Sequence, residues 1–165
     1  MRQAITMLLL VGATGLLAGG CGGSSKSSTT TTTAAAATTT VPAKPVTKLV
    51  YSRRMIAIGT GLTNSINSVD PSTAANAATS LVKLQADLRA AQKQLAALTP
   101  PANVAVPHRN LTAAVGEFAD ELDPVIVKLK AGKLAALQTV GQMAALKKIG
   151  TATAAISAAG YKISG

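Results

Sequence analysis

Residues Asp70–Leu98 read DPSTAANAATSLVKLQADLRAAQKQLAAL and carry the clearest helical pattern in the chain. Asp70 is a suitable N-cap residue, Pro71 suits the first position of a helix, and the pair Pro100-Pro101 cannot continue a helical ladder. Apolar residues recur every three or four positions, which places them on one face of a helix. We therefore predict an amphipathic helix whose apolar stripe is Ala74, Ala78, Leu81, Leu84, Leu88, Ala91, Leu95 and Leu98.

The segment before this stretch, residues 46–69, has the same periodicity. Its stripe consists of Tyr51, Met55, Ile58, Leu62, Ile66 and Val69. The second half of the segment contains many glycines, threonines, asparagines and serines, which are poor helix formers. We predict a helix here and expect its second half to be the least stable part of the domain.

Two further helical segments follow Pro101. The third begins at about Asn103 or Pro107 and runs to Leu122, and Asp123-Pro124 predicts either a kink or a new short helix capped by Asp123. The last is predicted as one helix over residues 134–159, with Gly132 and Gly160 as helix stops and Tyr161 packed on the preceding turn. The chain therefore predicts an all-α, up-down bundle of about four antiparallel helices.

The N-terminus has the three-part pattern of an export signal. Met1 and Arg2 give a positive start, residues 4–18 form an apolar run, and Leu16-Leu17-Ala18-Gly19-Gly20 leads into Cys21. The apolar run is short for a transmembrane helix, which needs about 20 mainly apolar residues. An uncleaved signal anchor is the alternative to a cleaved signal.

This segment resembles the lipobox of bacterial lipoproteins. In that family a cysteine after small residues receives a diacylglyceryl group, the signal peptide is removed on its N-terminal side, and a further acyl chain such as palmitate often follows. The resemblance implies lipidation of Cys21, although Ala18 stands where the family prefers leucine. The helical half is also loosely similar to small alanine-rich helical lipoproteins of actinobacteria. This likeness rests on the export signal, the Thr/Ser tether and the helical pattern around Pro100-Pro101, His108 and Gly160-Tyr161, and it implies location and fold but no chemistry.

Composition then divides the chain into three parts. Residues 1–20 are the expected signal peptide, residues 21–46 the lipidated cysteine with a disordered Thr/Ser/Ala linker, and residues 47–165 the helical domain. The linker is low in complexity and lacks large apolar side chains, so it cannot offset its ordering entropy. Its predicted role is a tether between membrane and bundle.

The chain is strongly basic, with 16 Lys and Arg residues against 6 Asp and Glu residues and a formal net charge of +10. For an exported protein this favours anionic lipid or a wall polymer as partner, while a solvated surface of scattered lysines is the alternative. Nucleic acid is not expected, because aromatic residues are only 2% of the chain. An up-down bundle would gather basic residues at the tether end, and the predicted anionic-surface contacts are Lys48, Arg53, Arg54, Arg109 and Lys162, with Lys44 in the tether.

No catalytic or metal pattern stands out. The single histidine, His108, is expected to be a structural or surface residue, partly exposed at a helix start. Glu117, Asp120 and Glu121 share one helical face by spacing, but no Glu-x-x-His accompanies them, so a solvated face is favoured over a di-iron site.

The sequence therefore predicts an exported lipoprotein, held on the outer side of the cell membrane by a lipidated cysteine. Its bundle serves as a binding or structural module at the cell envelope, with no cofactor, and the protein partner stays open. A carrier of a small apolar ligand between the helices is the first alternative, against which the many alanines argue because small residues let helices approach closely. An enzyme is the less favoured alternative.

Overall fold

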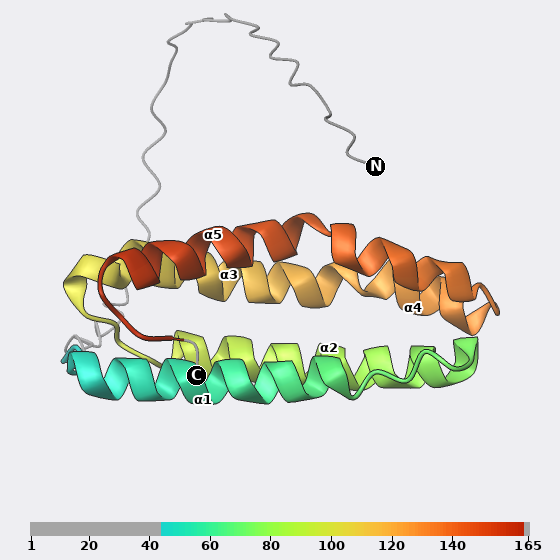
Figure 1. The fold of residues 1–165 in the computed structure, drawn as a ribbon, viewed down its shortest axis with the longest axis horizontal. Coiled ribbons are helices and arrows are strands. Elements are labelled where there is room, and N and C mark those ends of the chain that lie inside the picture. Colours follow the sequence, from blue (N-terminus) through green and yellow to red (C-terminus); the bar gives the residue numbers. More distant parts are fainter. Residues whose placement is uncertain (1–43, 164–165) are drawn as a thin grey trace, which may run out of the picture. The chain divides into compact units, whose positions relative to one another are not determined.

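The computed structural model describes residues 44–163, so Cys21, the predicted signal peptide and most of the predicted linker lie outside the described residues. The described part contains five α-helices and two 3₁₀ helices (Figure 1). None of its helices has both the length and the apolar character needed to cross a membrane. The elements are α1 (Lys48–Asn67), α2 (Ala74–Ala96), η1 (Ala102–Val104), α3 (Ala105–Glu121), α4 (Asp123–Lys130), η2 (Leu134–Gln142) and α5 (Ala144–Ala158).

These elements form the predicted all-α bundle of four antiparallel rods. The first two rods are α1 and α2, the third is α3 followed by α4, and the fourth is η2 followed by α5 (Figure 1). The α3 helix packs extensively against both α2 and α5, and α2 packs against α1 and α4. Going round the bundle, the order is therefore α1, α2, α3 and α5.

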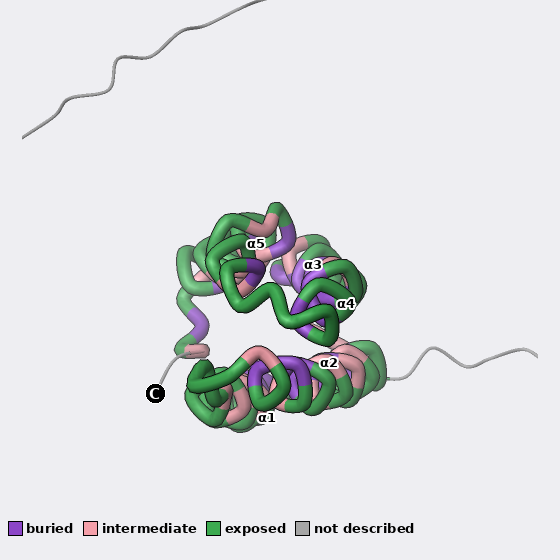
Figure 2. Tube along the Cα trace, turned by 90° about the vertical axis from the view of Figure 1, so that its right-hand side faces the viewer, coloured by how far each residue is buried: buried purple, intermediate pink, exposed green. Residues whose placement is uncertain are grey.

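The core is built mainly from the α2 stripe. Leu81, Leu84, Leu88 and Leu95 are at most 2% exposed, and Ala78 is buried with them (Figure 2). Phe118, the one phenylalanine in the chain, is buried on α3. The buried face of α2 agrees with the predicted stripe, and only Ala74, at the helix start, is incompletely buried.

The start of α2 differs from the prediction. Thr73, not Asp70, is the N-cap residue, and its hydroxyl accepts a hydrogen bond from the Asn76 amide at 3.1 Å. The Asp70 carboxylate instead accepts bonds from the Ser72 amide and the Asn76 side chain, which fixes the turn before the helix. Asp70 therefore shapes the turn three residues before the cap.

Both predicted glycine stops are confirmed. Gly132 and Gly160 have φ values of 79° and 85°, in the left-handed region that favours glycine. At Gly160 the Tyr161 amide donates to the Ile156 carbonyl and the Gly160 amide to the Ser157 carbonyl. This is a Schellman motif, and the same pair of bonds closes α4 at Gly132.

The Asp123-Pro124 step separates two helices, which settles the alternative in favour of a new short helix. Pro124 lies near the start of α4, where a missing N–H is tolerated. The predicted cap is wrong, however, because Leu122 occupies the N-cap position and the Asp123 carboxylate accepts a bond from Gln85 of α2.

The prediction of one last helix over residues 134–159 is also wrong. Residues 134–142 form the 3₁₀ helix η2, and Met143 is extended, with φ −61° and ψ 138°. Thr139, Val140 and Gly141 all have low helix propensity, so this stretch gives an α-helix little local support. A carboxylate oxygen of Glu121 on α3 accepts a hydrogen bond from the Ala145 amide at 3.3 Å, which satisfies a free N–H in the first turn of a new helix, α5.

Candidate functional site

An apolar groove runs between α1 and α5, and we call it the α1–α5 groove. It has a volume of about 210 Å³ and draws side chains from α1, α2, α3, α5 and the C-terminal tail. Other hollows on the domain lie between two neighbouring helices. The lips of the groove are partly exposed aliphatic residues, namely Ile58 and Leu62 on α1 and Leu146 and Ile149 on α5.

The lining offers no free hydroxyl to a ligand. Thr63 and Thr153 line the groove, but the Thr63 hydroxyl donates to the Gly59 carbonyl at 3.0 Å and the Thr153 hydroxyl to the Ile149 carbonyl at 2.9 Å. No buried side-chain nitrogen or oxygen in the described residues lacks a hydrogen-bond partner. The groove is therefore chemically suited to hydrocarbon, because its lining is mainly apolar and its two threonine hydroxyls already donate to backbone carbonyls.

A buried polar pair lies one helical turn before the start of the groove. The Nε2 atom of His108 is 3.0 Å from the Leu95 carbonyl, which can only accept, so Nε2 carries the proton. The Nδ1 atom is then an acceptor for the Tyr51 hydroxyl, 3.1 Å away. His108 is thus a neutral, fully bonded core residue at 3% exposure, and the expected partial exposure is wrong.

Burial shifts both groups toward their neutral forms. Desolvation lowers the pKa of His108, although its bond to the Leu95 carbonyl acts in the opposite direction. Desolvation, with a smaller contribution from Tyr161, raises the pKa of Tyr51 to about 12. The pair therefore stays uncharged at neutral pH and ties α1 to α3.

The C-terminal tail crosses from α5 to α1 at this end. Tyr161 is buried and packs edge-on against Tyr51, with ring centroids 5.3 Å apart, and its hydroxyl donates to Asn103 at 2.8 Å. Tyr161 therefore bridges to α1, beyond the packing on its own helix that was predicted. Lys48 places its ammonium 5.1 Å from the centre of the Tyr161 ring, and Ile163 lines the groove near Gly59.

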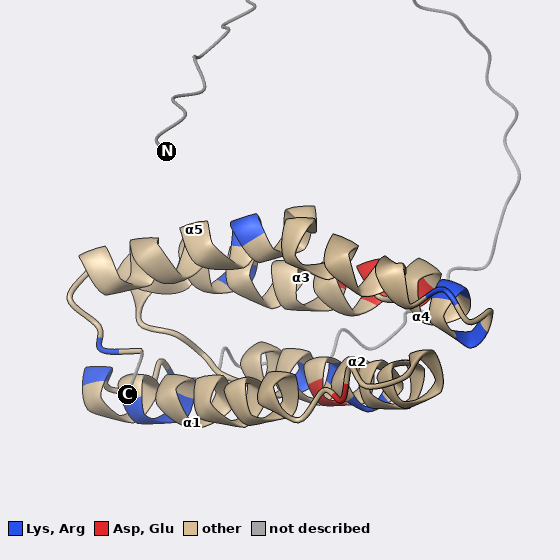
Figure 3. Cartoon of the chain, turned by 45° about the vertical axis from the view of Figure 1, so that its right-hand side comes forward, with Lys and Arg blue, Asp and Glu red and all other residues tan. Residues whose placement is uncertain are grey.

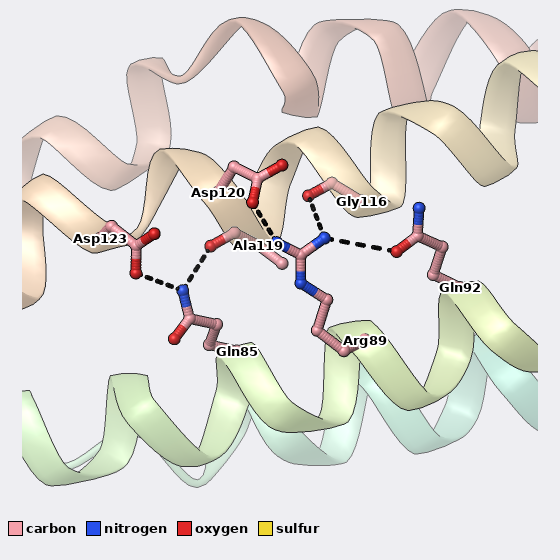
Figure 4. Close-up of polar contacts among 7 residues, drawn as sticks. All are labelled: Gln85, Arg89, Gln92, Gly116, Ala119, Asp120 and Asp123. Atoms are coloured by element: carbon pink, nitrogen blue, oxygen red, sulfur yellow. Dashed lines mark hydrogen bonds and ion pairs between the residues drawn. The ribbon is translucent and has the colours of Figure 1, made fainter.

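Polar contacts join α2 to α3 and α4 on another side of the bundle (Figure 4). Arg89 forms an ion pair with Asp120 and reaches the Gly116 carbonyl. Gln85 donates to the Ala119 carbonyl at 2.8 Å and to Asp123 at 2.6 Å. We call this set of contacts the α2–α3 seam.

The three acidic side chains of the α3 cluster contact two different neighbouring helices. Asp120 faces α2, whereas Glu117 pairs with Lys148 and Glu121 caps α5. The expected acidic face is at least partly exposed, and Glu117 balances a nearby lysine as predicted. The expectation of a single face is wrong, because these carboxylates bridge α3 to two different helices. The other acidic residues also have partners within the chain, because Asp87 accepts a bond from Ser65 at 2.7 Å and Asp70 fixes its own turn.

The predicted basic residues are near the starts of α1 and α3 or just after α5, and so lie toward the end where the chain enters the bundle. Figure 3 shows Lys and Arg at the start of α1 and again at the α4 end. The Val46 amide bonds to the Thr99 carbonyl there. Lys48 lies over the Tyr161 ring, and Lys162 follows Tyr161 in the sequence. Arg53 and Arg54 are exposed on α1. Arg109 is exposed beside a shallow hollow at the end of α2. In the described part, the only basic residues in ion pairs are Arg89 and Lys148.

No group of three or more potential metal ligands occurs among residues 44–163. Sequence reasoning kept a ligand site between the helices only as an alternative and did not locate the α1–α5 groove, since the many alanines argued against a large cavity. The available signal was local, because most groove-facing positions of residues 55–66 and 146–149 are Met, Ile or Leu and none is Ala. Comparisons of the chain with models of protein families, with curated proteins and with solved structures find no match.

Proposed function

We propose that this protein is an exported lipoprotein, anchored on the outer side of the cell membrane through Cys21, whose helical bundle binds an apolar ligand in the α1–α5 groove. The observation that carries the binding function is the groove itself, about 210 Å³ of space lined by aliphatic side chains of four helices. The sequence pattern around Cys21 supports the anchor.

The size of the groove favours a slender ligand. Pockets that enclose whole drug-sized molecules are about 300–1,000 Å³, so this groove suits a narrow chain. Its lining on α1 runs from Met55 to Ile66, about 16 Å at 1.5 Å per residue. Each buried methylene contributes about 0.8 kcal/mol, so a chain of about eight methylenes gains about 6 kcal/mol before the costs of association.

Binding without catalysis is supported by the state of the polar groups. Both ring nitrogens of His108 are engaged, and the groove threonines are bonded to their own helix. The carboxylates of Glu117 and Glu121 are held in contacts between α3 and α5. No pair of these groups is available to act as acid and base on a ligand in the groove.

The groove can be tested by filling it. In the whole chain carrying Cys21→Ser, the neutral dye Nile red should bind with increased fluorescence, and Thr153→Phe should weaken binding because the ring occupies the groove. Thr151→Phe is the matched control, since Thr151 is exposed on another face of α5 and its hydroxyl makes the same kind of bond, to the Lys147 carbonyl. Equal binding by all three proteins would refute the groove as the site.

The anchor is tested separately by cell fractionation. The unaltered chain should be found with the membrane, and Cys21→Ser should shift it to the soluble or unprocessed exported fraction. Mass spectrometry of the N-terminal peptide should show a diacylglyceryl modification on Cys21. An unmodified cysteine in a soluble protein would refute the anchor and leave the groove untouched.

A further inference from the structure

The two ends of the α1–α5 groove differ in charge. At the tail end, Lys162 lies between buried Tyr161 and groove-lining Ile163. Lys48 precedes Met55 by seven residues, so it stands on the same face of α1 as the groove, and its ammonium lies over the Tyr161 ring. All six acidic residues of the chain fall between positions 70 and 123, and none of them bonds to a residue of this end.

The opposite end of the groove is flanked by carboxylates. Asp87 bonds to Ser65, next to groove-lining Ile66 and Leu88. Glu121 bonds to the Ala145 amide, next to groove-lining Leu146. Lys148 pairs with Glu117 and interacts with Glu121 there, so charges of both signs are present at this end. The tail end carries two lysines without a carboxylate partner among the described residues, so an anionic group is attracted more strongly at the tail end and the groove has a direction.

We propose that the ligand is a single-chain amphiphile with an anionic head, bound with its hydrocarbon chain in the α1–α5 groove and its head beside Lys48 and Lys162. This inference rests on the proposed binding function. Both lysines are exposed, so the head remains in contact with water while the chain is buried. The apolar lining excludes a head group from the interior, because a charge buried without a partner is costly.

The shared chemistry is an unbranched chain ending in a carboxylate or a phosphate monoester. The test uses the whole chain carrying Cys21→Ser and measures displacement of bound Nile red at pH 8. Dodecanoate, dodecyl phosphate and neutral dodecanol have the same hydrocarbon chain, so their comparison isolates the head group. We expect the better anionic probe to bind several-fold tighter than dodecanol, and its identity distinguishes a fatty acid from a phosphate-bearing lipid.

The matched variants remove the same charge from two places. Lys48→Gln with Lys162→Gln should weaken binding of the anionic probe by about two- to fivefold per lysine, since exposed ion pairs contribute modestly, and should leave dodecanol binding unchanged. Lys128→Gln with Lys130→Gln, on α4, should change neither. Circular dichroism of both variants checks that the helical content is retained.

Each remaining outcome is decisive. If all three probes bind equally to the unaltered groove, the anionic head is refuted and the apolar binding function stands. If the α4 pair loses as much affinity as the tail-end pair, the attraction is diffuse and the proposed head position is refuted. If none of the probes displaces the dye and the dye itself does not bind, both proposals fail together.

Discussion

The α2–α3 seam and the α1–α5 groove are two sides of one bundle with opposite construction. Along the seam, an arginine and a glutamine of α2 reach carbonyls and carboxylates of the third rod, and small residues such as Gly116 and Ala119 are buried (Figure 4). Between α1 and α5, the described residues form no side-chain hydrogen bond and no ion pair with each other.

The contrast teaches that side-chain size and polar bridging determine how far two helices stand apart. Small residues with long polar partners close the α2–α3 seam, and aliphatic lips without polar partners leave the α1–α5 side open. Instead, α1 is held through α2 by Asp87 and through α3 by His108. The groove can therefore admit a ligand without breaking a contact that maintains the bundle.

The largest expected difference is between two aspartate substitutions, one in the core on α2 and one at the lip of the α1–α5 groove. Leu84→Asp should unfold the domain, because Leu84 is 2% exposed and an unpaired buried charge costs several kcal/mol. Leu62→Asp should leave the domain folded, since Leu62 lies on the open lip of the groove where water reaches it. Thermal unfolding followed by circular dichroism measures both, and equal losses would break the comparison.

The next largest effect concerns the hydrogen bond between Tyr51 and His108, which ties α1 to α3. Tyr51→Phe removes the donor to Nδ1 of His108 and leaves a buried acceptor unsatisfied, which costs about 1–3 kcal/mol. Tyr161→Phe should cost less, because Asn103 is exposed and can bond to water. Urea denaturation measures both changes, and a larger loss for Tyr161→Phe would contradict the assignment of Tyr51 as the principal tie.

The same pair predicts how stability changes with pH. Since folding lowers the pKa of His108, the unfolded chain binds more protons just below its ordinary pKa of about 6.5. The free energy of unfolding should therefore be highest above about pH 6.5 and fall as pH is lowered below it, by at most about 1.4 kcal/mol per pH unit.

A series of urea titrations between about pH 5 and 7.5 covers the range in which a histidine changes its charge. His108 is the single histidine, so His108→Gln should flatten the profile in this window. A profile that is already flat in the unaltered chain would show that His108 binds its proton equally well in both states.

The sequence contained enough to predict the bundle but not the spacing between its rods. Hydrophobic periodicity identified the buried stripe of α2. It identified the α1 stripe only in part, because Tyr51 and Met55 are buried but Ile66 is 47% exposed. Gly132 and Gly160 marked two helix ends. Periodicity tells which face of a helix is apolar, not how far the facing stripe lies, so the α1–α5 groove was missed. The alanine argument holds for α2 and α3 and does not apply to the larger residues of the groove.

Two other errors have the same physical origin, a contact between distant segments. The break at Met143 is accompanied by a hydrogen bond from the Ala145 amide to Glu121, 24 residues earlier in the chain. The burial of His108 depends on Tyr51, 57 residues away, and on the Leu95 carbonyl. The sequence close to Met143 and His108 contains neither partner. From that sequence alone, residues 134–159 are therefore predicted as one helix and His108 as a partly exposed residue.

The smallest effect sharpens what the α2–α3 seam contributes. Asp120→Asn removes the charge that pairs with Arg89, but both side chains are well exposed, at 62% and 41%. An exposed pair of this kind contributes up to about 1 kcal/mol, so the loss in the free energy of unfolding should be below that value and should vanish in 1 M salt, where charges are screened within about 3 Å. Gln85→Leu should cost more, because it leaves the partly buried Ala119 carbonyl contact unmade. Urea denaturation at low and high salt measures both variants. If Asp120→Asn proved the more damaging of the two variants at low salt, and this loss disappeared in 1 M salt, the seam would depend on its ion pair. The contrast with the groove would then be one of charge instead of packing and neutral hydrogen bonds.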